Sequence, residues 1–106
     1  MKFAVIYQFN VIQGKEEQFL SSWKRMTELI YEFENSFGSR LHTEKNGSYI
    51  AYALWPDSKT WENAGHHLPI EAEQLRHEMR SSCHDVQTLF EMEIQEDLLQ
   101  TTQFNS

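Results

Sequence analysis

The sequence has little cysteine, proline and glycine. Its 106 residues include one cysteine (Cys83), two prolines and four glycines. A single cysteine cannot form a disulfide within the chain, and it excludes a metal site built from several thiolates. No repeat and no low-complexity linker divides the chain, and its length suits one domain with one modest core. We therefore expect a single folded unit in a reducing setting.

Basic residues and long apolar runs are also scarce. Nine lysines and arginines stand against 16 acidic residues, which gives a net charge of −7. The basic residues are scattered, whereas nucleic acids and anionic membranes need a basic face. No apolar run approaches the ~20 residues of a membrane span, and nothing resembles a signal peptide. The sequence predicts a cytoplasmic protein that binds neither nucleic acid nor membrane.

Aromatic residues are plentiful, at 13% of the chain. Residues 2–12 alternate as a strand whose strongly apolar face begins at Phe3 and includes Tyr7. Gly14 ends this strand, and residues 15–37 form an amphipathic helix that ends near Gly38. The apolar residues of that helix recur at intervals of four and three, and the stripe predicts core packing. Its members are Phe19, Trp23, Met26, Ile30, Phe33 and Phe37.

A hairpin follows the long helix. Asn46-Gly47 joins a strand at 40–45 to a strand at 48–55, and Asn-Gly is the strongest short hairpin signal. Both faces of the second strand are largely apolar. Pro56 ends it, Asp57 or Ser58 is a candidate N-cap, and a short helix carries Trp61.

The rest of the chain predicts one more helix and one more strand. Pro69 suits the first turn of the helix, whose buried face holds Ala72, Leu75, Met79 and Cys83. A polar stripe lies beside it at Glu73, His77, Arg80 and His84. The strand covers residues 86–94, with Val86, Thr88, Phe90, Met92 and Ile94 on one face.

The order β, α, β, β, α, α, β predicts an α+β fold, the ferredoxin-like split β-α-β with an antiparallel sheet and helices on one face. The uncovered face would expose Ala4, Ile6 and Ile12, so we expect a homodimer formed through that face. Residues 1–97 make the domain and 98–106 a polar tail, with Leu98, Leu99 and Phe104 as candidate anchors.

These features resemble the antibiotic biosynthesis monooxygenase family over nearly the whole chain. The resemblance rests on the first strand with Gly14-Lys15-Glu16-Glu17, the Phe19 and Trp23 helix, Gly38, and the strand-to-helix passage from Leu54 to Trp61. It implies a dimeric α+β barrel. Members include oxygenases that act on aromatic phenols or quinols without metal or flavin, haem-degrading enzymes, and proteins of no known activity.

The chain departs from two branches of that family. Tyr7 stands where the haem-degrading branch has an asparagine, and Ala64 stands near its tryptophan. Ala64 and Ile70 stand close to the positions of two histidines of the quinol-type members, and His66 and His67 are out of register with those positions. The first departure counts against haem chemistry, and the second leaves the identity of a base open.

Oxygenation without a cofactor needs a base, a dry aromatic cavity and a donor to a substrate anion. Histidine is the natural base, because its usual pKa is ~6.5. The residues that the sequence offers for these roles are His66 and His67 as base, Tyr7, Tyr52 and Trp61 as aromatic walls, and Asn63 and Arg40 as donors. In the alternative reading, the two histidines are solvated loop residues and Trp61 is ordinary core.

The histidines also raise the question of a metal site. Glu73 and His77 are four residues apart, but no H-E-x-x-H motif or cysteine partner accompanies them. The sequence therefore predicts no metal and no cofactor. The function it favours is a cofactor-independent monooxygenase acting on a small aromatic phenol or quinol. The alternative is a non-catalytic dimer of the same fold that binds a small molecule or has a structural role.

Overall fold

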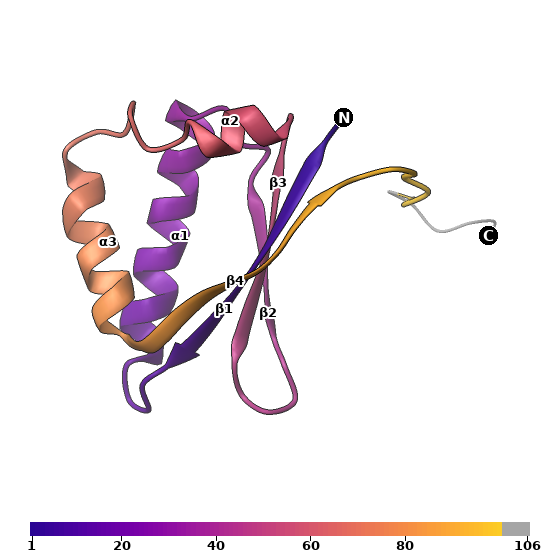
Figure 1. Ribbon diagram of the computed structural model, residues 1–106. Helices are drawn as coiled ribbons and strands as arrows, with labels where there is room; N and C mark the ends of the chain where they lie inside the picture. The colour runs from indigo at the N-terminus through magenta and orange to yellow at the C-terminus, as the bar shows by residue number, and fades with distance from the viewer. Residues whose placement is uncertain (101–106) are drawn as a thin grey trace.

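The computed structural model describes residues 1–100. Four strands and three helices follow one another in the predicted order (Figure 1). They are β1 (Phe3–Val11), α1 (Glu16–Phe33), β2 (Ser39–Thr43), β3 (Tyr49–Trp55), α2 (Ser58–Glu62), α3 (Glu71–Ser81) and β4 (Cys83–Glu93). None of the helices in this part of the chain has both the length and the apolarity to cross a bilayer.

The strands form one antiparallel sheet in the order β2-β3-β1-β4. All three helices lie on the same face of this sheet, and the other face is bare (Figure 1). The fold is therefore α+β and ferredoxin-like, as predicted. Because β1 is paired along both edges, its alternation decides which side chains turn toward the helices.

The helix-facing side of the sheet carries the core. Phe3, Val5 and Phe9 of β1 are buried there. Phe9 packs on Phe19 of α1, with ring centroids 5.0 Å apart, and Phe19 packs in turn on Tyr49 at 5.1 Å. The predicted inward face of the first strand is thus confirmed.

The first helix ends earlier than the sequence suggests. It stops at Phe33 rather than near Gly38, and Asn35 takes the left-handed conformation (φ 63°) just beyond the helix end. Gly38 also has a positive φ (98°) but lies past the helix, immediately before β2. Asparagine tolerates this conformation because its short polar side chain can bond locally. Phe33 and Phe37 are consequently exposed, and the predicted apolar stripe is confirmed only as far as Ile30.

The predicted start of α2 is confirmed. The Asp57 carboxylate accepts a hydrogen bond from the Thr60 backbone N–H at 2.8 Å and caps the helix. Pro56 separates this cap from the end of β3. The short helix is thereby fixed at the end of the sheet where β3 finishes and β1 begins (Figure 1).

The last strand differs from its predicted alternation. Ile6 of β1 pairs with Phe90, and the next residue, Tyr7, pairs with Thr88, so Leu89 is an extra residue in β4. A β-bulge of this kind reverses the faces of the residues beyond it. Thr88 therefore shares a face with Tyr7, whereas Phe90 and Met92 lie on the bare face with Ile6 and Ala4. The prediction that Thr88, Phe90 and Met92 share one face is wrong.

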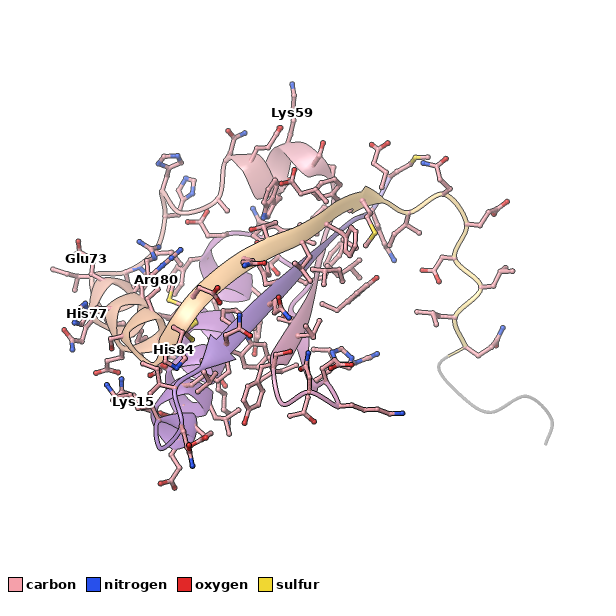
Figure 2. The ribbon with its side chains drawn as sticks, turned by 60° about the horizontal axis from the view of Figure 1, so that its bottom comes forward. Lys15, Lys59, Glu73, His77, Arg80 and His84 are labelled. Atoms are coloured by element: carbon pink, nitrogen blue, oxygen red, sulfur yellow. The ribbon has the colours of Figure 1, made fainter. Side chains whose placement is uncertain are left out.

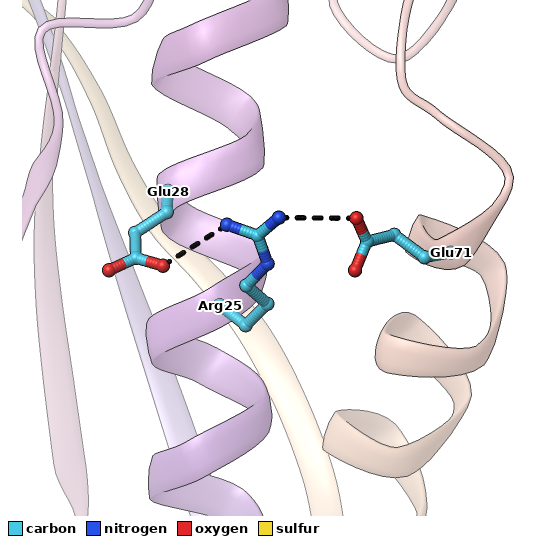
Figure 3. A network of polar contacts seen from close by, with 3 residues as sticks. All are labelled: Arg25, Glu28 and Glu71. Carbon is cyan, nitrogen blue, oxygen red and sulfur yellow. Dashed lines mark hydrogen bonds and ion pairs between the residues drawn. The ribbon is translucent and has the colours of Figure 1, made fainter.

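Helices α1 and α3 are joined by buried apolar contacts and by a surface ion network. Met26 and Leu29 of α1 pack with Ala72 of α3. Arg25 contacts Glu28 at 3.3 Å and Glu71 at 3.2 Å (Figure 3). Solvent screens these exposed charges, so the apolar contacts are the main attachment.

Of the predicted tail anchors, Leu98 and Leu99 are exposed in the subunit. Phe104 lies outside the described residues.

The contrast between Phe19 and its neighbour Leu20 gives a test of the core. Phe19 is fully buried, whereas Leu20 is 40% exposed on the outer side of α1. Phe19→Ala should lower the free energy of unfolding by about 3–5 kcal/mol, because it leaves a cavity beneath β1. Leu20→Ala should cost less than about 1 kcal/mol in the same urea titration. Equal losses from the two variants would contradict the assigned face of the helix.

Candidate functional site

A cavity of about 620 Å³ lies between the sheet and the three helices. Ala51 and Ala53 of β3 contribute to its floor, and Ala64 and Gly65 contribute to its wall after α2. These small residues leave space that larger side chains would fill. The volume is in the range of small-molecule sites. Five aromatic residues take part in the lining, namely Tyr7, Phe9, Trp23, Trp55 and Trp61.

A hydrogen bond ties α2 to the central strand across this cavity. The Trp61 indole Nε1–H donates to the Tyr7 hydroxyl oxygen at 2.9 Å. An indole N–H only donates, so the Tyr7 oxygen is the acceptor and its own proton stays available. Burial raises the pKa of Tyr7, the Trp61 bond offsets this in part, and the negative charge of Glu91 raises the pKa further. Tyr7 is therefore a neutral phenol that can donate to a ligand.

Trp55 contributes a second indole to the lining. Its side chain is 4% exposed, and Nε1 is the one fully buried side-chain nitrogen or oxygen among residues 1–100 that has no hydrogen-bond partner. A buried donor without an acceptor costs free energy. With the Tyr7 hydroxyl and three indole rings in its lining, the cavity is suited to an aromatic ligand that carries an oxygen acceptor.

Glu34 is a buried carboxylate in the lining that the sequence reasoning missed. It follows the last residue of α1 and is 4% exposed. Its Oε2 accepts the His67 backbone N–H at 2.7 Å, and its Oε1 lies 3.1 Å from His67 Nδ1. Burial acts to raise the pKa of this carboxyl, but hydrogen bonds from His67 and Gly65 and the charge of His67 together hold it below its usual value. Glu34 is therefore ionised at neutral pH.

The predicted catalytic residues lie at the end of α2 and beyond it, and none lines the cavity. Asn63, His66 and His67 are exposed. The side chain of His67 is 72% exposed but contacts Glu34, and Gly65 and Leu68 on either side of it do line the cavity. The structure therefore connects His67 to the lining of the cavity through the Glu34 carboxylate. It gives Asn63 and His66 no such connection.

Tyr7 and Trp61 lie together as predicted, whereas Tyr52 and Arg40 lie elsewhere. Tyr52 pairs with Arg40, and both alternate with cavity residues such as Ser39 and Ala53. Successive side chains of a strand point to opposite faces, so this pair lies on the bare face. The expectation that they share a cavity with Trp61 is corrected accordingly. Both faces of β3 are apolar, and its sequence alone did not show which one turns inward.

Helix α3 contributes two arginines to the lining, Arg76 and Arg80. Figure 2 shows Arg80 on α3 together with Glu73 and His77, with His84 at the start of β4. Arg80 belongs to the polar stripe that the sequence identified, but its position beside the cavity depends on how α3 packs. Among residues 1–100, no group of three or more His, Cys, Asp or Glu side chains is arranged to hold a metal ion.

Solved structures with the same fold include oxygenases. Neither a family model nor a curated protein matches the sequence. The chain is similar in structure to SnoaB, a cofactor-independent oxygenase from Streptomyces nogalater, with a TM-score of 0.74 and 17% identity over 93% of this chain and 98% of that one. It is also similar to an antibiotic biosynthesis monooxygenase, with a TM-score of 0.66 and 16% identity over 87% and 97% of the two chains.

A third similar structure is a dimeric ferredoxin-like protein of unknown function from a Jannaschia species. It has a TM-score of 0.68 and 9% identity, over 89% of this chain and 100% of that one. The chain therefore has the fold of the antibiotic biosynthesis monooxygenases. At these identities the likeness extends to the fold alone.

The Glu34–His67 contact predicts how stability depends on pH. Glu34 has a pKa below the usual 4.5 in the folded protein, so its contribution is present above that value and is lost as the pH falls through the folded pKa. Glu34→Gln should lower the free energy of unfolding by about 1–3 kcal/mol at about pH 7. The difference from wild type should narrow as the pH is lowered toward about 3, because Glu34 takes up a proton as the pH falls through its folded pKa.

Urea titrations at both pH values measure this difference. Glu32→Gln is the matched control, because Glu32 is exposed two residues earlier in α1. That variant should stay within about 0.5 kcal/mol of wild type at both pH values. If Glu34→Gln lowers the free energy of unfolding by the same amount at both pH values, the carboxylate charge is not what stabilises residues 63–68.

Proposed function

We propose that the protein is a cofactor-independent monooxygenase that acts on a small aromatic phenol or quinol. The observation that carries this proposal is the aromatic cavity with the Tyr7 hydroxyl held by Trp61 in its wall. A flat aromatic substrate would lie against the indole rings, and its oxygen would accept the free Tyr7 proton. The fold shared with SnoaB, a cofactor-independent oxygenase, supports the same reaction class.

The chemistry needs an electron-rich substrate anion, because triplet O₂ reacts with closed-shell organic molecules by accepting one electron at a time. A base removes a proton from the substrate, and the anion passes one electron to O₂. The resulting radical and superoxide join through a new C–O bond. The peroxide then takes up a proton and loses water, so one oxygen atom remains as a carbonyl and the other leaves in water. A neutral donor beside the substrate oxygen stabilises the anion.

Tyr7 is the proposed donor and His67 the proposed base. Glu34 is ionised, so its Oε1 would accept a hydrogen bond from the Nδ1–H of His67, and Nε2 would keep the lone pair that a base needs. The carboxylate would also stabilise the imidazolium that forms after proton transfer. His67 lies between the lining residues Gly65 and Leu68 and is not itself part of the lining, so the proposal requires its exposed ring to turn toward a bound substrate.

The bare face of the sheet supports the proposed homodimer. Ile6, Ile50, Tyr52 and Leu54 are half-buried on that face, and beyond the bulge Phe90 is 58% and Met92 39% exposed. An apolar surface of this kind is unusual on a monomer. The Jannaschia protein of the same fold is dimeric, which supports the proposal.

A non-catalytic dimer that binds a small molecule is the second candidate. It is favoured by the exposure of His66, His67 and Asn63, since none of them lines the cavity. In that case the aromatic cavity would bind a ligand, but no base would activate it. Catalytic turnover separates the two candidates.

Oxygen uptake by metal-free protein, measured with a panel of quinols and anthrones, tests the proposed activity. One member of the panel should be consumed with uptake of one O₂ per molecule. His67→Gln should lower turnover of that substrate by about 10²-fold, and Tyr7→Phe should lower it by about 10-fold or more. His84→Gln, at an exposed histidine outside the cavity lining, is the control and should retain turnover. Full activity in both His67→Gln and Tyr7→Phe would remove the assigned roles.

Dimerisation is tested through Phe90. Wild type should scatter light as a dimer at micromolar concentration, with an interface of roughly 1,600 Å². Phe90→Asp should be monomeric, because it would bury an unpaired carboxylate in that interface. Phe90 is exposed in the subunit, so the variant should still fold. Leu20→Asp, on the outer side of α1, should remain dimeric, and a monomeric wild type would contradict the proposal.

A further inference from the structure

Two arginines of α3 stand between the cavity and the molecular surface. Arg76 and Arg80 are four residues apart, so they lie on one face of the helix. Both contribute to the lining of the cavity, and both also line an open surface depression of about 510 Å³. Glu73, His77 and Ser81 complete that depression. The two guanidinium groups are thus positioned where a ligand would pass from the surface into the cavity.

Neither guanidinium group is neutralised by a partner in the described part of the chain. Within residues 1–100, neither Arg76 nor Arg80 forms an ion pair, although the chain has 16 acidic residues and nine basic ones. Arg25, by contrast, contacts two carboxylates (Figure 3). Glu73 is the one carboxylate in the depression, so its two arginines leave a net positive charge there. This charge stands out in a protein whose net charge is −7.

The remaining charges of the cavity are at a different place. Glu34 and Glu62 line it where α1 and α2 end, whereas both arginines come from α3. Figure 1 shows α2 across one end of the sheet and α3 alongside α1. The cavity therefore has an acidic region near Trp61 and a basic region at α3. A ligand with one anionic group would be oriented by this difference.

We propose that Arg76 and Arg80 bind a carboxylate on the aromatic substrate and so select phenols that carry an acid group. The two oxygens of a carboxylate match the donor fork of a guanidinium, and the group adds little volume to a flat ring. With its carboxylate at α3, the phenolic end of the substrate is directed toward Tyr7 and Trp61. This inference rests on the proposed function, because it takes the cavity to be the substrate site.

Calorimetric titration with a matched pair of compounds tests the inference without turnover. The probes are 5-hydroxy-1-naphthoic acid and its methyl ester, which share the ring and the phenol but differ in charge. Wild type should bind the acid at least about tenfold more tightly than the ester. The double variant Arg76→Gln/Arg80→Gln should lose this preference and keep its affinity for the ester. Both arginines are exposed, so the variant should melt close to the wild-type temperature.

The control is Lys15→Gln/Lys59→Gln, which removes the same charge at two exposed residues outside the cavity lining (Figure 2). It should retain the preference for the acid. Equal binding of acid and ester to wild type, a preference that survives in the arginine variant, or no binding of either compound would each overturn the inference. The oxygen-uptake experiment tests the proposed function separately. If wild type prefers the acid but consumes no oxygen, the proposed oxygenase function is wrong, and the protein binds aromatic acids without converting them.

Discussion

The pairing of β1 along both edges is the constraint on which the rest of this structure depends. A central strand cannot rotate its side chains away from the layer that covers it, so Phe3, Val5 and Phe9 form the floor of the core and Tyr7 is held among them. The bulge in β4 opposite Tyr7 adjusts the edge strand to this centre. It also moves Phe90 to the bare face. One strand therefore positions a candidate catalytic hydroxyl on one face of the sheet and a candidate interface on the other.

The cavity persists because small side chains face large ones across the helix-facing layer. Ala51 and Ala53 on β3 lie below the space that Trp61 borders. A larger side chain in place of either alanine would fill the cavity. The bond from Trp61 to Tyr7 fixes the indole over this space. The Tyr7 oxygen accepts this bond, so its own proton stays free to be donated to an oxygen-bearing ligand.

Local patterns predicted the fold well because its main features are local. Alternation assigned the inward face of β1, and Asp57 and Asn46-Gly47 marked the start of α2 and the hairpin. Two errors arose where one residue changed a periodic pattern. The apolar spacing of α1 continues to Phe37 in the sequence, but the helix ends before Asn35. The extra residue Leu89 in β4 puts Thr88 and Phe90 on opposite faces of the sheet, although their spacing predicts one face.

The site was harder to predict because its contacts join distant segments. Trp61 and Tyr7 were named together, but the Glu34–His67 contact spans 33 residues and has no local signature. The position of Arg76 and Arg80 at the cavity depends on how α3 packs against α1 through Ala72.

The most direct test of this account is whether an aromatic phenol enters the cavity. Nuclear magnetic resonance resolves the indole N–H signals of the three tryptophans, and 1-naphthol is a suitable probe. The account predicts saturable shifts of the Trp23, Trp55 and Trp61 indole signals, since all three rings line the cavity. The backbone amide signals of Ile50 and Tyr52 on the bare face should change little. Shifts confined to the bare face, or indole signals that do not move at saturating probe, would contradict it.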